Sequence, residues 1–449
     1  MSAYEPLFRH LLYPAYETVL RRRDTLRYLR EYERSQWLAP GEVEALQWRK
    51  LRALLDHCWT SVPYYRKRWR ALGIADVRDI RTPADYARLP PLTKPEIRSH
   101  FEELVSPEHR ARLLYKTTGG STGEPLRFGY TRESYERRIA IMHRGYGWAG
   151  ARLGQRTLYL WGLPEQQTRK DRLYHAAFNR RMLNAFQMRE DRMQAYADAF
   201  EAFRPETVVS YVAPILRLAE WLRANGRTLP PPQRILTAAE ALYPSQRAIL
   251  EEAFGCRTFN TYGCREFMLI ASECMHGRLH TTADHLMVEL GRPLDGDEAG
   301  TRELLVTDLH NFGMPLLRYA NGDLATPDSD ACPCGLGLPT LRSVDGRKLD
   351  ALRTVDGRLV PGEFVVYAFL CAKGVRRYQA VQTAIDRVVV NIVADEDIDR
   401  DSVDQAAAML RKTLGDATTL DVEYTQDIPL TPSGKHRVTI NALAQAGVA

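Results

Sequence analysis

The feature that most limits the fold is an alternation of two hydrophobic patterns between residue 113 and about residue 345. Short runs rich in β-branched and aromatic residues, typical of strands, occur at 157–161, 207–211 and 234–237. Segments with helical patterns lie between or beside them, at 191–203, 214–225 and 245–253. Such alternation favours a layered α/β domain. Later strands are predicted in an antiparallel region, at 288–290 and 302–307.

Regions with a different character flank this α/β core. The first 100 or so residues are predicted to be helical, with the clearest amphipathic segment at 42–57. After Gly346 the sequence predicts a small α+β domain, with three strands and one amphipathic helix, at 360–370, 387–393, 420–424 and 401–414. We therefore predict a large N-terminal domain over residues 1–346, which begins with the helical lead-in, and a small mobile C-terminal domain over residues 347–449.

The composition is that of an ordinary globular protein, with 45% hydrophobic and 26% charged residues in a chain of 449. The net charge is +6, but the arginines are scattered and no basic block alternates with aromatic residues, which argues against a nucleic-acid partner. A mildly basic surface does attract anionic substrates such as ATP. No signal peptide and no run of about 18 apolar residues occurs, so we expect a cytoplasmic protein that does not cross a membrane.

Residues 116–125, Lys-Thr-Thr-Gly-Gly-Ser-Thr-Gly-Glu-Pro, place three glycines and four hydroxyl side chains in ten residues. Successive backbone N–H groups in such a loop can hold an anion, and the hydroxyls add donors. The segment is not a P-loop, which ends in Gly-Lys-Ser/Thr, and it does not contain the dinucleotide pattern G-x-G-x-x-G. A mobile polar surface loop is the alternative, so a phosphate-binding role depends on the rest of the chain.

Three further patches supply groups that a nucleotide site needs. Residues 260–266, Asn-Thr-Tyr-Gly-Cys-Arg-Glu, combine an aromatic ring that could stack on a base with the carboxylate of Glu266, a suitable Mg²⁺ ligand. Asp323 follows a Gly turn and suits a pair of ribose hydroxyls, which need an acceptor. Lys435 follows Gly434 and can bring a point charge to a phosphate or carboxylate. Each patch alone also fits an ordinary turn or an exposed lysine.

A fourth patch consists of cysteines and histidines. Cys332 and Cys334 form a tight pair, one residue closer than the usual C-x₂-C, and Cys274 with His280, or less favourably His276, supplies a second pair. Zinc prefers four N or S ligands in a tetrahedron, and clustered cysteines in a chain without secretion signals favour a metal over disulfides. Four protein ligands leave no open position, so the predicted site is a structural zinc site. Buried free thiols are the alternative.

Together, and in this order, the patches resemble the adenylate-forming superfamily of acyl-CoA synthetases, adenylation domains and luciferases. The likeness is greatest to its phenylacetate–CoA ligase branch, which includes CapK-like proteins. The resemblance covers nearly the whole chain and rests on the ordered set rather than on any single motif. The segments that carry it are 62–65, 89–94, 117–125, 238–240, 262–266, 306–309, 314–319, 322–323, 332–335, 346–347 and 433–435.

The resemblance implies the following roles. Lys435 would contact the acyl carboxylate and the α-phosphate, Glu266 would bind Mg²⁺, and Thr117 would begin the phosphate cradle. The implied nucleotide contacts are Thr118, Gly119, Gly120, Ser121, Thr122, Gly123, Ala238, Ala239, Glu240, Asn260, Thr261, Tyr262, Asp323 and Arg347. The implied substrate pocket is formed by Tyr211, Ala213, Gly263 and Cys264. The implied hinge lies at Leu349 or Asp350, and the zinc set of CapK-like members would be Cys274, His280, Cys332 and Cys334.

The implied activity is ATP-dependent conversion of a carboxylic acid, by preference an aryl acid, to an acyl-adenylate with release of pyrophosphate. Transfer to a thiol such as coenzyme A would follow after the small domain rotates. The implied cofactors are ATP or AMP, Mg²⁺ and a structural zinc ion. Some members of this branch dimerise, so a homodimer is a further hypothesis.

The sequence departs from the family pattern at three places. Ala238 replaces the usual Gly, Cys264 and Arg265 replace small Ser or Thr residues, and the usual hinge Asp or Lys falls on Leu349, with Asp350 next. The altered hinge keeps open an alternative in which the acceptor is an amine, a hydroxyl or a carrier-protein thiol, in natural-product biosynthesis. A non-catalytic nucleotide-binding relative is a third hypothesis, against which the intact set of charged site residues argues.

Overall fold

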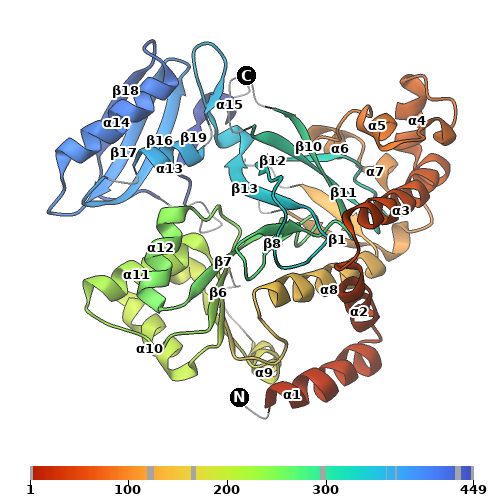
Figure 1. The fold of residues 1–449 in the computed structure, drawn as a ribbon, viewed down its shortest axis with the longest axis horizontal. Coiled ribbons are helices and arrows are strands. Elements are labelled where there is room, and N and C mark those ends of the chain that lie inside the picture. Colours follow the sequence, from red (N-terminus) through yellow and green to blue (C-terminus); the bar gives the residue numbers. More distant parts are fainter. Residues whose placement is uncertain are drawn as a thin grey trace.

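The computed structural model describes residues 4–118, 126–162, 168–293, 300–360, 362–369, 372–429 and 436–445. Helices make up most of the chain before the first strand and lie on one side of the molecule, in red and orange (Figure 1). Four of them have a proline in their first turn, where its missing N–H is not needed. The helices of this region are α1 (Tyr4–Leu7), α2 (Thr25–Ser35), α3 (Pro40–Ser61), α4 (Pro63–Ala71), α5 (Pro83–Ala87), α6 (Lys94–Ser99) and α7 (Phe101–Leu104), with short π or 3-10 segments at Phe8–Leu12, Ala15–Leu20, Val77–Asp79 and Arg110–Arg112.

An 11-stranded mixed sheet forms the centre of the molecule, in the order β10-β11-β12-β13-β9-β8-β7-β6-β5-β3-β4. Its parallel part consists of β3 (Thr157–Trp161), β4 (Arg180–Asn184), β5 (Thr207–Tyr211), β6 (Arg234–Ala238) and β7 (Arg257–Tyr262). Its antiparallel part consists of β8 (Ala271–Glu273), β9 (Leu279–Thr281), β10 (Leu286–Pro293), β11 (Arg302–Asp308), β12 (Tyr319–Pro327) and β13 (Thr340–Arg347). A separate hairpin pairs β1 (Leu114–Thr117) with β2 (Arg127–Tyr130).

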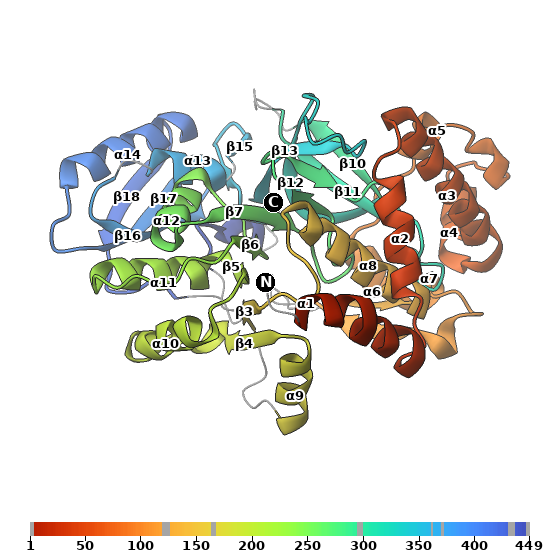
Figure 2. The same ribbon diagram turned by 60° about the horizontal axis from the view of Figure 1, so that its bottom comes forward.

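Helices cover both faces of the parallel strands, and β3, β5 and β6 bury apolar side chains toward both helical layers. On one face α10 (Met193–Phe203), α11 (Val212–Ala224) and α12 (Pro244–Phe254) bury Phe200, Ile215 and Leu250 (Figure 2). On the other face α8 (Arg132–Trp148) and the turn after it pack against Val209 and Phe259. The remaining helical segments of this part are α9 (Arg169–Ala177), Ala185–Gln187 and Glu190–Arg192.

The carboxyl-terminal part has sheets of its own. The 11-stranded sheet ends at Arg347, a 3-10 turn, η7 (Lys348–Asp350), follows, and a new sheet begins at Leu352. A four-stranded sheet in the order β18-β17-β16-β19 is covered by helices and shares a buried core with them. The elements are β14 (Leu352–Arg353), β15 (Leu359–Val360), α13 (Gly362–Ala368), β16 (Val375–Ala384), β17 (Arg387–Ala394), α14 (Arg400–Leu414), β18 (Thr419–Tyr424), β19 (Thr439–Asn441) and α15 (Ala442–Gln445). The division of the chain at 346/347 stays a prediction.

The prediction of a strand over 360–370 is wrong, because most of that segment is helix α13. Its β-branched and aromatic residues favoured a strand. The side chains that it buries are Val365, Ala368 and Phe369, at the i, i+3, i+4 spacing of one helical face. They contribute to the same core as α14, so tertiary packing overrides the local preference.

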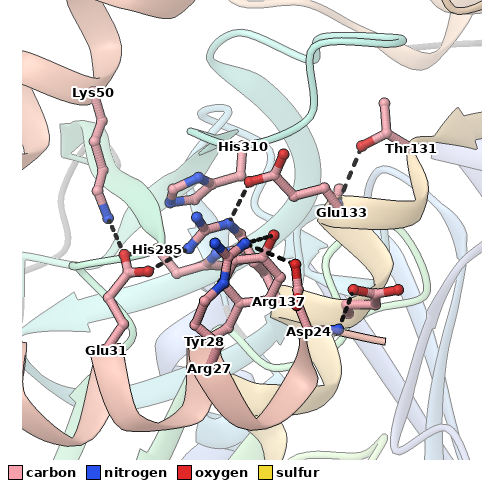
Figure 3. Close-up of polar contacts among 12 residues, drawn as sticks. Asp24, Arg27, Tyr28, Glu31, Lys50, Thr131, Glu133, Arg137, His285 and His310 are labelled. Atoms are coloured by element: carbon pink, nitrogen blue, oxygen red, sulfur yellow. Dashed lines mark hydrogen bonds and ion pairs between the residues drawn. The ribbon is translucent and has the colours of Figure 1, made fainter. Parts of the chain in front are cut away.

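A buried polar cluster joins the helical lead-in to the large sheet (Figure 3). The cluster includes two salt bridges with almost no solvent exposure. Arg138 pairs with Asp308 at 2.9 Å, and Arg144 pairs with Asp284 at 2.5 Å. Around them Tyr32 contacts the ring of His285, which stacks on His310, and Arg137 and Lys50 both approach Glu31. Removing one partner of such a pair would leave an uncompensated buried charge, so the cluster fixes α2, α3 and α8 relative to the sheet.

None of the helices in the described ranges combines the length and the apolar character that crossing a bilayer requires.

Candidate active site

Most of the predicted site residues that the structure describes meet at the carboxyl edge of the parallel strands. Tyr211 ends β5, Ala238 ends β6 and Tyr262 ends β7. In open α/β sheets ligands bind in the crevice outside this edge. The carboxyl-terminal part, in blue, lies beside β6 and β7 at this edge (Figure 1).

Asp323 lies at the centre of a hydrogen-bonded group that joins β7 to β12. The Tyr262 hydroxyl donates to Asp323 Oδ2 at 2.6 Å, and the Asn321 amide donates to the same oxygen at 2.9 Å and to the Tyr262 oxygen at 2.8 Å. Burial, followed by the Asp323 charge, raises the pKa of Tyr262 well above its usual range, so the phenol stays a donor. Arg347 faces Asp323 across the strand pair, and its Nε lies 3.6 Å from Oδ1. Asp323 is therefore a fixed carboxylate that accepts hydrogen bonds at the edge of the site.

Glu266 is buried at the turn that follows β7. The Tyr319 hydroxyl donates to its Oε1 at 2.9 Å, and burial with the nearby Glu266 charge raises the pKa of Tyr319. The turn needs Gly263, because a Cβ there would lie 1.7 Å from the Met268 carbonyl oxygen. Cys264 is the next residue, and burial, followed by the Glu266 charge, raises its thiol pKa well above the usual range, which keeps it neutral. A buried, oriented carboxylate of this kind fits a hard cation such as Mg²⁺.

Lys94 belongs to the segment 89–94 that carries the family resemblance, and the structure places it beside the candidate site. Leu92, two residues earlier, forms a parallel bridge to Tyr319, with hydrogen bonds Leu92 N to Arg318 O at 3.1 Å and Ala320 N to Leu92 O at 3.0 Å. This bridge brings Lys94 near Arg347, Glu266 and Asp323, and burial, followed by the Arg347 charge, lowers its pKa. The Leu-Thr-Lys run after two prolines was the only sequence signal for it.

Glu240 contacts both parts of the molecule. Its Oε2 accepts from the backbone N–H of Ala213 at 2.8 Å, at the start of α11. The helix dipole stabilises a negative charge at this end. Glu240 Oε1 accepts from the backbone N–H of His436 at 2.9 Å. Ala239, just before it, has the left-handed backbone conformation, with φ of 70°. Glu240 therefore holds the residue that follows Lys435 against the edge of the large sheet.

The two ends of the glycine-rich segment come together on the β1–β2 hairpin. The Thr118 N–H donates to the Leu126 carbonyl at 2.9 Å, and the Leu126 N–H donates to the Thr118 hydroxyl at 2.9 Å. Arg265 donates to the Thr117 carbonyl at 2.9 Å, which ties the base of the segment to the Glu266 turn. The predicted phosphate contacts Gly119, Gly120, Ser121, Thr122 and Gly123, and the predicted catalytic Lys435, lie outside the described residues.

An aromatic group lines the end of the site at β3 and β5. The rings of Trp161 and Tyr211 lie 4.4 Å apart, and Phe186 lies 6.3 Å from Tyr211. A Cβ at Gly162 would lie 2.2 Å from the Phe186 ring, so glycine allows the ring to approach. Of these side chains only Tyr211 was predicted from the sequence.

Two other predicted nucleotide contacts make structural hydrogen bonds. The Thr261 hydroxyl donates to the Thr237 carbonyl at 2.7 Å, and the Asn260 N–H donates to Glu273 at 2.9 Å.

At the predicted hinge, Leu349 is the middle residue of η7 and Asp350 pairs with Arg437. Burial raises the pKa of Asp350, and the Arg437 charge opposes that shift.

The four predicted zinc ligands form one cluster. The ligand atoms of Cys274, His280, Cys332 and Cys334 all lie within 4.8 Å of one another, with 3.6 Å between Cys274 Sγ and Cys332 Sγ and 3.3 Å between Cys334 Sγ and His280 Nε2. Ligand bonds of about 2.0–2.3 Å in a tetrahedron give separations of this size. The second ring nitrogen of His280 contacts the Leu338 carbonyl at 2.9 Å, an orientation common in metal-binding histidines. The residues fit zinc, and His276 contributes only its backbone N–H, to Cys274.

Comparison with known proteins agrees with this geometry. Residues 352–442 match the model of the CapK C-terminal domain family. Protein CapK of Staphylococcus aureus is 27% identical over 375 residues, which cover 80% of this chain and 81% of that protein. The phenylacetate-coenzyme A ligase of Thermus thermophilus is 26% identical over 76% of this chain and 78% of its own length. The predicted resemblance to the phenylacetate–CoA ligase and CapK branch of adenylate-forming enzymes is confirmed.

Solved structures give the same fold. A 2-hydroxyisobutyryl-CoA ligase, in its postadenylation state with 2-HIB-AMP, matches 93% of each chain with a TM-score of 0.74 at 17% identity. The same ligase in the thioesterification state, with 2-HIB-AMP and CoA, matches 92% of each chain with a TM-score of 0.60. The predicted fold class, a large α/β part followed by a smaller α+β part in an adenylate-forming architecture, is confirmed.

Proposed function

We propose that this protein is an AMP-forming acid ligase. It activates a carboxylic acid with ATP to an acyl-adenylate, releases pyrophosphate, and transfers the acyl group to the thiol of coenzyme A. The observation that carries the proposal is the meeting of Asp323, Glu266 and the Glu240–His436 contact at one edge of the sheet. Phenylacetate-coenzyme A ligases among the relatives support the same reaction class.

The described residues support specific roles in that reaction. Asp323, held by Tyr262 and Asn321, accepts hydrogen bonds from the ribose hydroxyls, and Arg347 beside it contacts the nucleotide. Glu266 holds Mg²⁺, which when bound offsets negative charge on the ATP phosphates. Lys435 immediately precedes His436, whose N–H donates to Glu240, and it contacts the carboxylate and the α-phosphate. Attack of a carboxylate on a phosphorus brings two anions together, so cations at this point favour the transition state.

The substrate is proposed to be an aryl acid. Trp161, Tyr211 and Phe186 supply aromatic faces near the end of β5, and Cys264 supplies a neutral wall. Aromatic rings stack on one another in offset or edge-to-face arrangements and bury large areas.

Zinc at Cys274, His280, Cys332 and Cys334 is proposed to be structural, because it would join β8 and β9 to the 332–334 turn. A homodimer, a cytoplasmic location and the absence of a nucleic-acid partner stay predictions.

The arrangement of the two parts supports an adenylation-type conformation. The TM-score is higher against the postadenylation state than against the thioesterification state of the same ligase, 0.74 and 0.60, although both matches cover nearly the same share of the chain. The Glu240–His436 hydrogen bond lies where the two parts meet. Thioester formation would then require this contact to break.

The test is acid-dependent exchange of labelled pyrophosphate into ATP, over a panel of aryl and alkyl carboxylic acids. We expect exchange with at least one aryl acid, and its loss in Asp323→Asn. No exchange with any acid would reject the proposal. Mass spectrometry of products with coenzyme A, amines, hydroxyl compounds and a carrier-protein thiol then identifies the acceptor. An amide, ester or carrier-bound thioester without CoA thioester would favour the alternative, a role in natural-product biosynthesis.

A further inference from the structure

A small cavity of about 50 Å³ lies at the opposite edge of the parallel sheet from the candidate active site. Its walls include Thr157 and Thr207, the first residues of β3 and β5, together with His143 from α8 and Arg180 from β4. Strand β5 runs from Thr207 in this wall to Tyr211 in the active site, a distance of about 13 Å at about 3.3 Å per residue. The cavity is thus a separate place, connected to the active site by strands β3 and β5.

Arg180 brings a positive charge into this wall without a negative partner. Its guanidinium lies over the Phe178 ring at 4.9 Å and the Tyr159 ring at 5.7 Å. Within the described part of the chain it forms no salt bridge and donates no hydrogen bond. Aromatic faces stabilise a cation, but they do not satisfy the five N–H donors of a guanidinium. Arg180 is half-buried, and its donors are open to a ligand in the cavity.

Two neutral donors face the same space. Gln155 is only 6% exposed. Its Oε1 accepts from the Arg152 N–H at 2.9 Å and from Arg234 at 3.2 Å, whereas its amide nitrogen donates to no described residue. His143 contacts the Tyr13 hydroxyl through Nε2 at 3.1 Å, and burial, followed by the Arg180 charge, lowers its pKa to about 3, so the ring is neutral. The Gln155 amide therefore offers N–H donors beside the cavity that are not used by the described residues, and a ligand that accepts hydrogen bonds would suit them.

The charged side chains that line the cavity are positive. Arg152 and Arg180 are both lining residues, and none of the described lining residues carries a carboxylate. A water molecule needs about 10–15 Å³ of such space, so the cavity has room for about three to five waters, or for one small ion and its contacts. We propose that this cavity is an anion site that binds a small oxyanion, a carboxylate or phosphate group, through Arg180 and the Gln155 amide.

The proposal does not depend on the proposed ligase activity, and its test needs no turnover. Crystals of the full chain are soaked in sodium bromide and the anomalous scattering of bromine is mapped, for the wild type, Arg180→Gln and Arg181→Gln. Arg181 is the next residue on β4 and is exposed, so it is the matched control. We expect a bromide peak beside Arg180 in the wild type and in Arg181→Gln, and none in Arg180→Gln. Absence of the peak in the wild type would overturn the proposal.

A solution measurement accompanies the crystals. Inorganic phosphate is titrated calorimetrically into each protein in the presence of saturating AMP, so that the nucleotide site is occupied. We expect Arg180→Gln to weaken phosphate binding at least about tenfold, because hydrogen bonds to charged groups are the strong ones, and Arg180→Lys to retain most of it. A bromide peak that persists in Arg180→Gln, or equal phosphate affinity in all variants, would mean an adventitious ion only and would contradict the proposal.

Discussion

Replacing Glu240 by Gln should separate the two half-reactions of the proposed ligase. In the structure the Glu240 carboxylate accepts one hydrogen bond from Ala213 and one from His436, at 2.8 and 2.9 Å. The first contact lies within the large part, whereas the second lies between the two parts and is made by the residue that follows Lys435, the lysine proposed for adenylation. A perturbation of Glu240 therefore acts on the conformation in which Lys435 reaches the active site.

The magnitude follows from the type of bond. A hydrogen bond to a charged group contributes about 1.5–3 kcal/mol. Gln keeps one neutral acceptor oxygen, and Glu240 is half-buried, so we expect Glu240→Gln to cost about 1.5 kcal/mol in the adenylation transition state, or about tenfold in rate. Glu240→Ala removes both acceptors and should slow adenylation by about 100-fold.

The assay measures each half-reaction separately. Pyrophosphate exchange with the best acid of the panel reports adenylation, and thioester formation from synthetic acyl-AMP and coenzyme A reports the second step. We expect the second rate to change less than about twofold in Glu240→Gln, because the His436 contact is not made in that conformation. Glu252→Gln, an exposed position on α12, is the control and should leave both rates unchanged. Equal slowing of both half-reactions, or unchanged adenylation, would refute this reasoning.

Three further outcomes are expected. Trp161→Ala should raise the KM for an aryl acid about tenfold and leave the KM for ATP unchanged, since the ring contacts Tyr211 at the acid end of the site; a rise in both would contradict this. Metal analysis is expected to find one zinc ion per chain in the wild type; Cys332→Ser should lose it and lower the Tm, whereas Cys256→Ser, outside the cluster, should keep the metal. Burial lowers the pKa of Lys50 to about 8 in the folded protein, whereas its pKa in the unfolded chain is near 10.5. Between these two pH values the unfolded chain binds more protons than the folded protein. The contribution of Lys50 to stability therefore rises with pH in this range. Urea unfolding of the wild type and of Lys50→Met measures the free energy of unfolding at each pH. From pH 7.5 to 10.5 the free energy of unfolding of the wild type should rise by up to about 3 kcal/mol relative to that of the variant. The same pH dependence in both proteins would reject the shifted pKa.

Local patterns predicted three of the five parallel strands. The runs at 157–161 and 207–211 coincide with β3 and β5, and 234–237 lies within β6, because strands covered on both faces are rich in apolar and β-branched residues. Strands β4 and β7, which carry more polar residues, were not predicted. The same rule failed at α13, where Phe364 and Val365 favour a strand but Val365, Ala368 and Phe369 share one buried helical face. Which pattern prevails depends on the partner element, and a single segment does not contain that information.

The chemistry of the site was only partly visible in the sequence. Carboxylates and cysteines at turns are recognisable from their residue type, and the four predicted zinc ligands do form one cluster. Lys94 was missed because its place depends on a two-residue bridge to β12, more than 200 residues later in the chain. Glu240 was predicted to contact the nucleotide, and in the structure its carboxylate accepts hydrogen bonds from the backbone N–H groups of Ala213 and His436. Long-range pairing of backbone groups leaves no pattern in a single sequence.

The contacts around η7 limit where the two parts can pivot. Arg347 pairs with Asp323 in the large sheet, and Lys348 approaches Glu303 of that sheet at 3.2 Å. Asp350 instead pairs with Arg437, and the Asn441 amide donates to the Ala351 carbonyl at 2.9 Å.

Around η7, Arg347 and Lys348 are therefore bonded to the large part, whereas Asp350 and Ala351 are bonded to the carboxyl-terminal part. A rotation that preserves both sets of contacts must change the backbone dihedral angles at Leu349, because hinges are the few residues that absorb such changes. Asp350, the candidate hinge carboxylate, lies one residue after the family position of the hinge. It would then move with Arg437 as part of the rotating carboxyl-terminal part.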